Sequence, residues 1–468
     1  MQRFLPEVES LAQHEVPAWY RDAKLGIFVH WYPSTVPAFA PLVDSPFELA
    51  DRHGWAHALK HSPYAEWYQN SLSIPGSPVA EHHAQHWPGV PYDEFVRRFV
   101  DASDGWDPKP WADLFAQSGA RYVVHGSKHH DGVTMWPSRM PNPFKGPGWS
   151  TRRNTVTELA DAVRAHGLRF GLYYSGGLDW TFGGLPIDSF EALIRAIPQG
   201  REYAEYADGH WRELIDLVGP DVLWNDIGYP LAANGPQLIA DYYNQHPDGV
   251  INDRFDVIGV RRGTAHADFV TPEFAQRSEI DLRMWETCRG IGKGFGYNAL
   301  EGEEHYLSVD ALVSLFVDVV AKGGNLLLNV GPTARGEIPA MQAARLAGLG
   351  WWLRTNGEAI YGTRPWVRAE GTTDTGQHVR FTTSHGDPAR SSTTRSSTGT
   401  VYAIVLGTPV GDQLGLDLRP APGAAVRLLG HGVPLEWTAT DRGCTVRLPE
   451  PPAATPAVTI ACSAVDAR

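Results

Sequence analysis

The chain has 468 residues, which is more than one hydrophobic core usually holds, so two domains are expected. Its contents of 43% hydrophobic and 20% charged residues are typical of a globular protein. The net charge of −13 argues against a nucleic acid partner and against an anionic membrane surface, because both select basic patches.

The cysteines and the N-terminal residues exclude further classes of protein. Cys288, Cys444 and Cys462 are too few and too scattered for a disulfide framework or a structural zinc site. Residues 1–9 lack the apolar stretch of a signal peptide, and no segment is long and apolar enough to span a bilayer. We therefore expect a cytoplasmic protein.

Strand-like and helix-like segments alternate from about residue 24 to about residue 355, which predicts a parallel sheet flanked by helices. No G-x-G-x-x-G follows the first strand, so a nucleotide-binding sheet is not indicated. Eight strands over this length favour a (β/α)8-like TIM barrel over an open doubly wound sheet. The predicted strands are Leu25–His30, Tyr122–His125, Phe170–Ser175, Val222–Asp226, Val250–Asp253, Phe269–Glu273, Arg283–Glu286 and Asn325–Val330.

Helix signals lie between several of these strands. Thr155 is a predicted helix cap, with Glu158 completing a capping box. Ser308 is predicted to cap another helix, whose apolar stripe ends at Lys322. The connection from Ser34 to about Asp107 is long for a barrel, and we expect it to fold over the mouth.

After about residue 365 the pattern changes to short alternating runs separated by Gly, Pro and Asp, which predicts an all-β sandwich. The expected domains are a catalytic barrel over residues 1–364 and a C-terminal sandwich over residues 365–468. The Ser/Thr/Arg-rich stretch from Ser384 to Thr400 is predicted to be a hairpin loop. The predicted strands here are Val379–Thr382, Val401–Leu406, Val426–Leu429, Cys444–Leu448 and Val458–Cys462.

Polar side chains follow almost every predicted barrel strand, at the end where barrel enzymes place catalytic groups. The strongest candidate is Asp226, at the end of the apolar run that begins at Val222. The competing interpretation is that Asp226 only turns the chain before Gly228. The other groups at strand ends are His30, His129, His130, Asp131, Tyr173, Asp253, Arg254, Glu273 and Glu286.

The adjacent pair His129 and His130 suggests a metal site, with Asp131 as a third ligand. However, neighbours on an extended segment point to opposite sides, and no H-E-x-x-H spacing is present. Neutral imidazoles that hydrogen-bond to hydroxyl groups fit better. We expect no metal and no cofactor.

Two carboxylates among His, Tyr, Arg and Trp side chains suit glycoside hydrolysis, in which one carboxylate attacks the anomeric carbon and a carboxylic acid protonates the leaving oxygen. Asp226 is the candidate nucleophile and Glu273 the candidate acid. The alternative for Glu273 is a residue of a simple surface turn, because Pro272 precedes it.

Several motifs in the chain resemble those of the α-L-fucosidases of glycoside hydrolase family 29. Lys24–Trp31 (KLGIFVHW) resembles the opening AKFGIFIHWG, and Glu66–Tyr68 is similar to the EWY element. Lys128–Gly132 matches KHHDG, the most specific of these signals. Trp224–Asp226 and Lys322–Pro332 (KGGNLLLNVGP) resemble two further family motifs.

The resemblance implies a retaining mechanism with Asp226 as nucleophile. The segment from Ala267 to Phe274 is similar to DFxTxEY of bacterial members, which implies that Glu273 is the acid/base. Two departures are Tyr32 in place of the glycine of HWG and Pro272 before the acid/base. The substrate-binding residues expected by this similarity are His30, Glu66, Trp67, His129, His130, Tyr173 and Arg254. Because fucose lacks the C6 hydroxyl, an apolar wall is expected there, with Trp224 or Phe295 as candidates.

The sequence leaves two alternatives to an α-L-fucosidase. A related barrel glycosidase could act on another sugar, such as a galactoside, which has a hydroxyl at C6 where fucose has none. A carbohydrate-binding protein could keep the scaffold without catalysis, although it would not need both carboxylates. The expected partner is a fucosylated oligosaccharide or glycoconjugate, and assembly into a homo-oligomer is left open.

Overall fold

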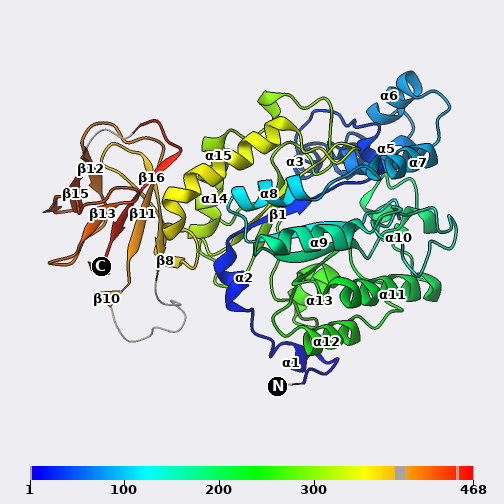
Figure 1. Cartoon of the computed structure of the whole chain (residues 1–468), viewed down its shortest axis with the longest axis horizontal. Coiled ribbons are helices and arrows are strands. Elements are labelled where there is room, and N and C mark those ends of the chain that lie inside the picture. The colour runs from blue at the N-terminus through cyan, green and yellow to red at the C-terminus, as the bar shows by residue number, and fades with distance from the viewer. Residues whose placement is uncertain (1–2, 385–395, 398, 450–452, 467–468) are drawn as a thin grey trace.

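The computed structural model describes residues 3–384, 396–397, 399–449 and 453–466. Figure 1 shows a large part built of helices around a sheet, and a C-terminal part built of strands. Within the described ranges, no helix is long and apolar enough to cross a membrane.

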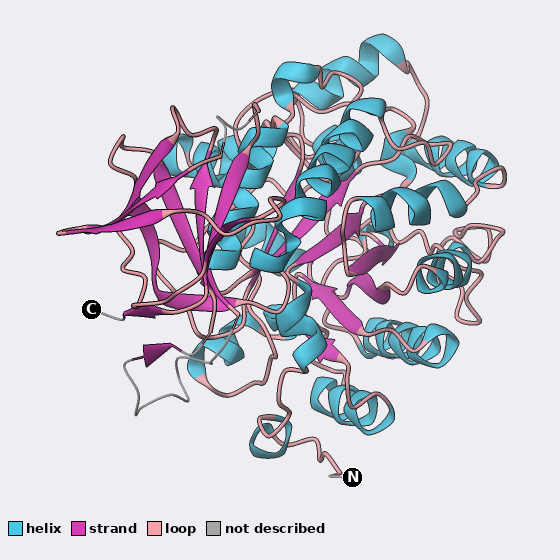
Figure 2. Cartoon of the chain, turned by 60° about the vertical axis from the view of Figure 1, so that its left-hand side comes forward, coloured by secondary structure: helices cyan, strands magenta, loops and turns pink. Residues whose placement is uncertain are grey.

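The large part contains one parallel sheet of seven strands in the order β5-β4-β3-β2-β1-β7-β6. Its residues are buried along nearly the whole length of every strand, as a sheet covered on both faces requires. Figure 2 shows the strands inside a ring of helices. The strands are β1 (Leu25–Val29), β2 (Tyr122–Lys128), β3 (Arg169–Ser175), β4 (Val222–Asp226), β5 (Val250–Ile251), β6 (Glu286–Gly290) and β7 (Asn325–Val330).

The predicted strand Phe269–Glu273 is wrong, so the eight-stranded barrel is confirmed only in part. The segment lies between β5 and β6 and makes single parallel bridges to both sides. It cannot form a continuous ladder, because Pro272 has no N–H and the N–H of Thr271 donates to the Asp253 carboxylate at 3.1 Å. The predicted strand Arg283–Glu286 is displaced, since β6 begins at Glu286.

Helices cover the outside of the sheet, and α14 begins after the cap Ser308 as predicted. The expected cap Thr155 is wrong: Asn154 accepts the capping hydrogen bond from Thr157, and Thr155 donates to the Met135 carbonyl instead. The covering helices are α8 (Lys109–Gln117), α9 (Thr155–Ala165), α11 (Arg201–Val218), α12 (Gly235–Gln245), α13 (Val257–Arg262), α14 (Val309–Ala321) and α15 (Ala340–Asn356).

The long connection after β1 folds into five α-helices, which lie together at one side of the large part (Figure 1). They are α3 (Pro46–His53), α4 (Trp55–Lys60), α5 (Tyr68–Ser73), α6 (Pro78–His86) and α7 (Tyr92–Ser103), with η2 (Ala65–Trp67) between α4 and α5. A shorter insertion after β3 contains η3 (Trp180–Phe182) and α10 (Phe190–Ala196). Both insertions leave the carboxyl ends of their strands, the end at which barrel enzymes bind substrate.

The C-terminal part consists of antiparallel sheets, as predicted. A five-stranded sheet, β13-β16-β11-β9-β8, and a three-stranded sheet, β12-β15-β14, share one hydrophobic core. The predicted loop from Ser384 to Thr400 lies mostly outside the described residues. The strands are β8 (Arg364–Thr372), β9 (His378–Thr383), β10 (Ser396–Ser397), β11 (Val401–Leu406), β12 (Gln413–Leu416), β13 (Val426–Leu428), β14 (Trp437–Thr440), β15 (Gly443–Arg447), β16 (Ala457–Cys462) and β17 (Val465–Asp466).

The second face of the five-stranded sheet packs on α14 and α15. Tyr402 and Ile404 of β11 belong to the same hydrophobic cluster as Leu346 and Trp352 of α15. Trp352 donates from its indole nitrogen to the Ala457 carbonyl at 2.9 Å. The sheet domain is therefore fastened to helices on the outside of the parallel sheet.

The N-terminal segment contains α1 (Val8–Leu11) and α2 (Ala18–Ala23). A buried ion pair holds this segment at the amino ends of the parallel strands. His14 contacts the Asp268 carboxylate through Nδ1 at 2.8 Å and the Pro247 carbonyl through Nε2 at 3.0 Å. Because both ring nitrogens face acceptors, both must donate, and His14 is protonated. Burial lowers the pKa of His14, but the hydrogen bond and charge of Asp268 outweigh burial and raise the pKa.

We expect this ion pair to make stability depend on pH. The pKa of His14 is raised, so its contribution is complete below the ordinary value of about 6.5 and is lost as the pH rises through the raised pKa. The midpoint of thermal unfolding should therefore fall more between pH 6 and pH 9 for the wild type than for His14→Gln. His166→Gln, which alters an exposed pair with Asp113, is the control. An equal fall in wild type and His14→Gln would contradict the assignment.

Candidate active site

Polar side chains gather where the parallel strands end. His30 follows β1, His129 and His130 follow β2, Tyr173 lies in β3, and Asp226 is the last residue of β4. Arg254 lies in η4 (Asp253–Phe255) after β5, and Glu273 ends the irregular segment between β5 and β6. The predicted site residues thus come from successive positions around one end of the sheet.

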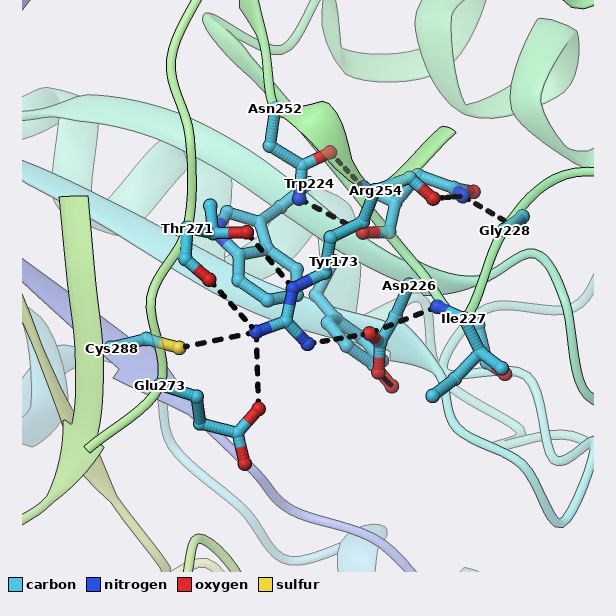
Figure 3. Close-up of polar contacts among 12 residues, drawn as sticks. Tyr173, Trp224, Asp226, Ile227, Gly228, Asn252, Arg254, Thr271, Glu273 and Cys288 are labelled. Atoms are coloured by element: carbon cyan, nitrogen blue, oxygen red, sulfur yellow. Dashed lines mark hydrogen bonds and ion pairs between the residues drawn. The ribbon is translucent and has the colours of Figure 1, made fainter. Parts of the chain in front are cut away.

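Asp226 is buried and hydrogen-bonded on both oxygens. Its Oδ1 accepts from Arg254 Nη1 at 2.8 Å and from the Ile227 N–H at 3.0 Å, and its Oδ2 accepts from the Tyr173 hydroxyl at 2.9 Å (Figure 3). Burial raises the pKa of Asp226, but the charge of Arg254 and these hydrogen bonds outweigh it and hold the pKa below its ordinary value. The carboxylate is therefore ionised at neutral pH.

The backbone after Asp226 is set in an uncommon conformation. Ile227 has a φ of 58°, which a β-branched residue rarely adopts. The Asn225 side chain fixes the turn by donating to the carbonyls of Gly228 at 2.7 Å and Arg254 at 3.1 Å. This strain lies at the residue whose N–H contacts the Asp226 carboxylate, as is common at functional sites.

Glu273 accepts hydrogen bonds on both oxygens from residues of other segments. The Tyr64 hydroxyl donates to Oε1 at 2.7 Å, and Arg254 Nη2 donates to Oε2 at 3.0 Å. Glu273 is therefore part of a built polar site and not of a free surface turn.

Arg254 joins the two carboxylates. Its Nη1 pairs with Asp226 and its Nη2 with Glu273, while Nε donates to the Thr271 hydroxyl at 2.9 Å (Figure 3). The guanidinium carbon lies 4.6 Å from the centre of the Trp224 ring, a cation–π contact. Burial lowers the pKa of Arg254, but the two carboxylates raise it well above its ordinary value, so the cation is permanent.

Hydrogen bonds fix the tautomers of His30 and His130. The Asn329 amide nitrogen donates to Phe295, so its oxygen must accept from His30 Nδ1 at 2.7 Å. The Ser175 hydroxyl donates to the Leu178 carbonyl, so its oxygen must accept from His130 Nδ1 at 2.6 Å. Both rings therefore carry hydrogen on Nδ1 and offer Nε2 as an acceptor.

These imidazoles are neutral. Burial lowers the pKa of His30 to about 4 and that of His130 to about 3, and it lowers the pKa of His129 well below its ordinary value. Neutral rings can accept hydrogen bonds from hydroxyl groups without repelling the Arg254 cation.

His129 packs between two aromatic rings and has a buried Nδ1 without a hydrogen-bond partner among the described residues. Its ring lies 5.8 Å from that of Tyr173 and 4.7 Å from that of Tyr32. Tyr32 is only 1% exposed, and a Cβ added at Gly126 would lie 1.6 Å from its hydroxyl oxygen. Tyr32, one of the two departures from the family motifs, therefore packs directly against His129 and also contacts the ring of His30 at 5.6 Å.

Glu66 and Trp67 reach the site from η2. Glu66 is 4% exposed and accepts from the Gly296 N–H at 2.7 Å. Burial raises the pKa of Glu66 to about 7. The Trp67 ring meets the edge of His130 at 5.2 Å and that of Trp180 at 5.7 Å.

A hydrogen bond to the buried Glu286 carboxyl group fixes the position of the Trp224 ring. Its indole nitrogen donates to Oε1 of Glu286 at 2.9 Å, and the hydroxyls of Tyr20 and Tyr122 donate to Oε2 at 2.8 and 2.5 Å. Burial raises the pKa of Glu286 to about 6, although these donors lower it. This network fixes the ring over which the Arg254 guanidinium lies.

The pair His129 and His130 does not form a metal-binding group with Asp131 in the described part of the chain. The one group there with suitable ligand spacing is His14, His266 and Asp268, whose ligand atoms lie within 4.8 Å of one another. His14 and Asp268 of this group form the buried ion pair described above, and His266 contacts the same carboxylate through Nε2 at 3.5 Å.

The sequence analysis did not name two residues that orient site side chains, Tyr64 and Asn329. Tyr64, which holds Glu273, stands two residues before Glu66 and has no signal of its own. Asn329, which fixes His30, did carry a signal, because it is a polar residue inside the apolar run of β7.

Comparison with known proteins finds similar sequences and structures over nearly the whole chain. A protein-family model described as α-L-fucosidase matches residues 1–358. An α-L-fucosidase of Branchiostoma floridae is 32% identical over 96% of this chain and 92% of its own length. The plasma α-L-fucosidase of Homo sapiens is 33% identical over 96% of this chain and 89% of its own length. The crystal structure of Thermotoga maritima α-fucosidase in complex with fucose is 40% identical, covers 98% of this chain and 100% of that chain, and has a TM-score of 0.83.

Proposed function

The chain belongs to the α-L-fucosidase family, and we propose that it releases L-fucose from terminal α-L-fucosides by a retaining double displacement. Asp226 attacks the anomeric carbon, and Glu273 acts as general acid and then as general base. The observation that carries this proposal is the contact of both carboxylates with the two terminal nitrogens of Arg254. That bridge is compatible with the separation of about 5–5.5 Å that retaining enzymes need.

Asp226 is suited to the role of nucleophile because its carboxylate is ionised and held in a fixed orientation. Arg254, Tyr173 and the Ile227 N–H hold its carboxylate in one orientation before substrate binds. Preorganisation of this kind lowers the entropic cost of reaching the transition state. As an oxygen of Asp226 forms its bond to the anomeric carbon, the bond from that carbon to the leaving oxygen breaks, and the negative charge of the carboxylate is neutralised in the ester.

Glu273 suits the acid/base because its contacts can change. In the free site it accepts from Tyr64 and Arg254; when Glu273 carries the proton, the Tyr64 hydroxyl can accept from it, because a phenol hydroxyl both donates and accepts. The glycosidic oxygen then takes the proton, and the resulting carboxylate activates water in the second step.

The pocket also supports selectivity for fucose. Phe295 is buried, with its ring 5.0 Å from His30 and 5.6 Å from Tyr64. We propose that Phe295 joins Trp224 in an apolar wall that accepts the C6 methyl group of fucose. A galactoside would place its C6 hydroxyl against that wall without a hydrogen-bond partner, which is unfavourable.

The domain division at residues 364 and 365 is part of the proposal. It is supported by β8, which begins at Arg364 and directly follows the last helical element of the large part. The single bridges of residues 269–273 likewise support a sheet that closes into a barrel. The cytoplasmic location stays a prediction from the sequence. A homo-oligomeric state is part of the proposal.

We expect release of fucose from 4-nitrophenyl α-L-fucoside in the presence of EDTA, because the proposed chemistry uses carboxylates and a guanidinium. Initial rates with and without EDTA, and with 4-nitrophenyl β-galactoside and α-galactoside, test this directly. Loss of activity in EDTA with recovery on adding zinc, or faster hydrolysis of a galactoside, would contradict the proposal.

We expect His129→Ala and His130→Ala each to lower kcat/KM by about tenfold to hundredfold, the value of one or two hydrogen bonds in the transition state. The physical reason is that neutral imidazoles bind the sugar hydroxyls. His86→Ala, on the outer face of α6, is the matched control. Kinetics equal to wild type for both pocket variants would place the pair outside the site.

A further inference from the structure

We propose that Phe47, Trp55 and Phe190 form an aromatic shelf that binds sugar rings of the leaving group, beyond the fucose itself. The inference rests on the proposed function and extends it to a distal glycan subsite. It identifies the preferred substrate class as a fucosylated oligosaccharide rather than a small fucoside.

The three rings of the aromatic shelf are exposed and adjacent. Phe47 is 43%, Trp55 39% and Phe190 48% exposed. The Trp55 ring lies 6.0 Å from each of the other two. Large aromatic side chains rarely remain in water together without a binding role.

The position of the shelf in the fold points to substrate. Phe47 and Trp55 belong to the insertion after β1, and Phe190 begins α10 in the insertion after β3. Both insertions leave the carboxyl ends of strands, where Asp226 also stands. Of the exposed Phe, Trp and Tyr side chains in the described ranges, only Trp351 on α15 lies away from the connections that follow β1, β2 and β3.

A buried cluster connects the shelf to the fucose pocket. Leu59, one turn after Trp55 on α4, and Ala192, two residues after Phe190, pack in one cluster with Trp180. Trp67 and Ile227 pack against the same cluster, and Trp67 meets His130 in the pocket. The aromatic shelf therefore lies on the outer side of this hydrophobic cluster, and the wall of the fucose pocket lies on its inner side. Because the cluster separates the shelf from the fucose pocket, we expect the shelf to contact a sugar beyond the one bonded directly to fucose.

The surroundings of the shelf favour a saccharide over other occupants. Arg52 of α3 forms an exposed ion pair with Asp44, and the rings of His53 on α3 and His57 on α4 lie 4.7 Å apart. Sugar rings present apolar C–H faces to aromatic rings and hydroxyl groups to such polar neighbours. A protein interface needs about 800 Å² on each partner, which three rings interrupted by polar groups do not provide.

The test is a ratio of two specificity constants. The first substrate is 4-nitrophenyl α-L-fucoside, which has no sugar in its leaving group. The second is whichever of 2'-fucosyllactose, 3-fucosyllactose and α1,6-fucosylated chitobiose the wild type hydrolyses fastest. For Trp55→Ala and Phe190→Ala, we expect the ratio of glycan to aryl kcat/KM to fall about tenfold, as for one lost stacking contact.

Trp351→Ala removes an exposed tryptophan from α15 and is the matched control, with an unchanged ratio expected. An unchanged ratio in both shelf variants, or an equal fall in Trp351→Ala, overturns the proposal. A lowered molecular mass in the shelf variants with an unchanged ratio also overturns it and assigns the rings to a contact between copies. Failure of the wild type to cleave the aryl fucoside would instead reject the proposed function, so the two failures are distinguishable.

Discussion

Replacing Asp226 with glycine should lower kcat for 4-nitrophenyl α-L-fucoside by on the order of 10⁴-fold or more, because no other group can attack the anomeric carbon. The substitution leaves Arg254 and Tyr173 in place and opens a space on the face of the sugar where the carboxylate stood. Azide should occupy this space and attack once, with inversion. The expected product is β-L-fucosyl azide.

Asp221→Ala is the matched control for this experiment. Asp221 lies just before the same strand, where it pairs with Arg169 at 2.6 Å, at the end away from the site. This variant should keep hydrolytic activity and form no β-L-fucosyl azide, because its nucleophile is intact. Substantial hydrolysis by Asp226→Gly without azide would contradict the assignment of the nucleophile.

Replacing Glu273 with alanine should lower kcat/KM by about 10²- to 10⁴-fold for a sugar leaving group, which needs protonation. An aryl leaving group needs little protonation, so the covalent intermediate should still form from an activated substrate. Azide should then intercept that intermediate in a second inversion and yield α-L-fucosyl azide. The product configuration, read by NMR, is thus opposite to that from Asp226→Gly.

Glu66 is the alternative acid, because burial raises its pKa to about 7 and it lies in the same pocket. The Gly296 N–H donates to Oε2 of Glu66 at 2.7 Å and orients the carboxyl group without adding a charge. If Glu273→Ala keeps wild-type activity on a sugar leaving group and Glu66→Ala does not, Glu66 is the acid and the proposal for Glu273 is wrong.

The strand ends could be located from the sequence because parallel strands are apolar runs that stop at polar groups. This pattern correctly brings His30, Tyr173, Asp226 and Arg254 to one end of one sheet. Pairing from β1 to β4 is regular apart from one register shift between Gly126 and Lys128, so a local pattern was sufficient there.

The parts of the fold and of the site that the sequence did not predict depend on contacts between distant segments. The irregular path of residues 269–273 follows from a side-chain hydrogen bond between Thr271 and Asp253, which hydrophobic periodicity does not record. The burial of Tyr32 depends on the space above Gly126, which belongs to another strand. In the C-terminal part, β12 and β14 are short and partly exposed strands without a clear alternation, so their existence was not predicted.

The central claim is that Asp226 forms a covalent fucosyl ester. The most direct measurement is peptide mass spectrometry after incubation with 2-deoxy-2-fluoro-L-fucosyl fluoride, in which fluorine slows hydrolysis of the ester. We predict one added 2-fluorofucosyl group on the peptide that contains Asp226, with none after incubation of Asp226→Gly. A label on another carboxylate, or an unlabelled enzyme that releases β-L-fucose first from an α-L-fucoside, would contradict the account.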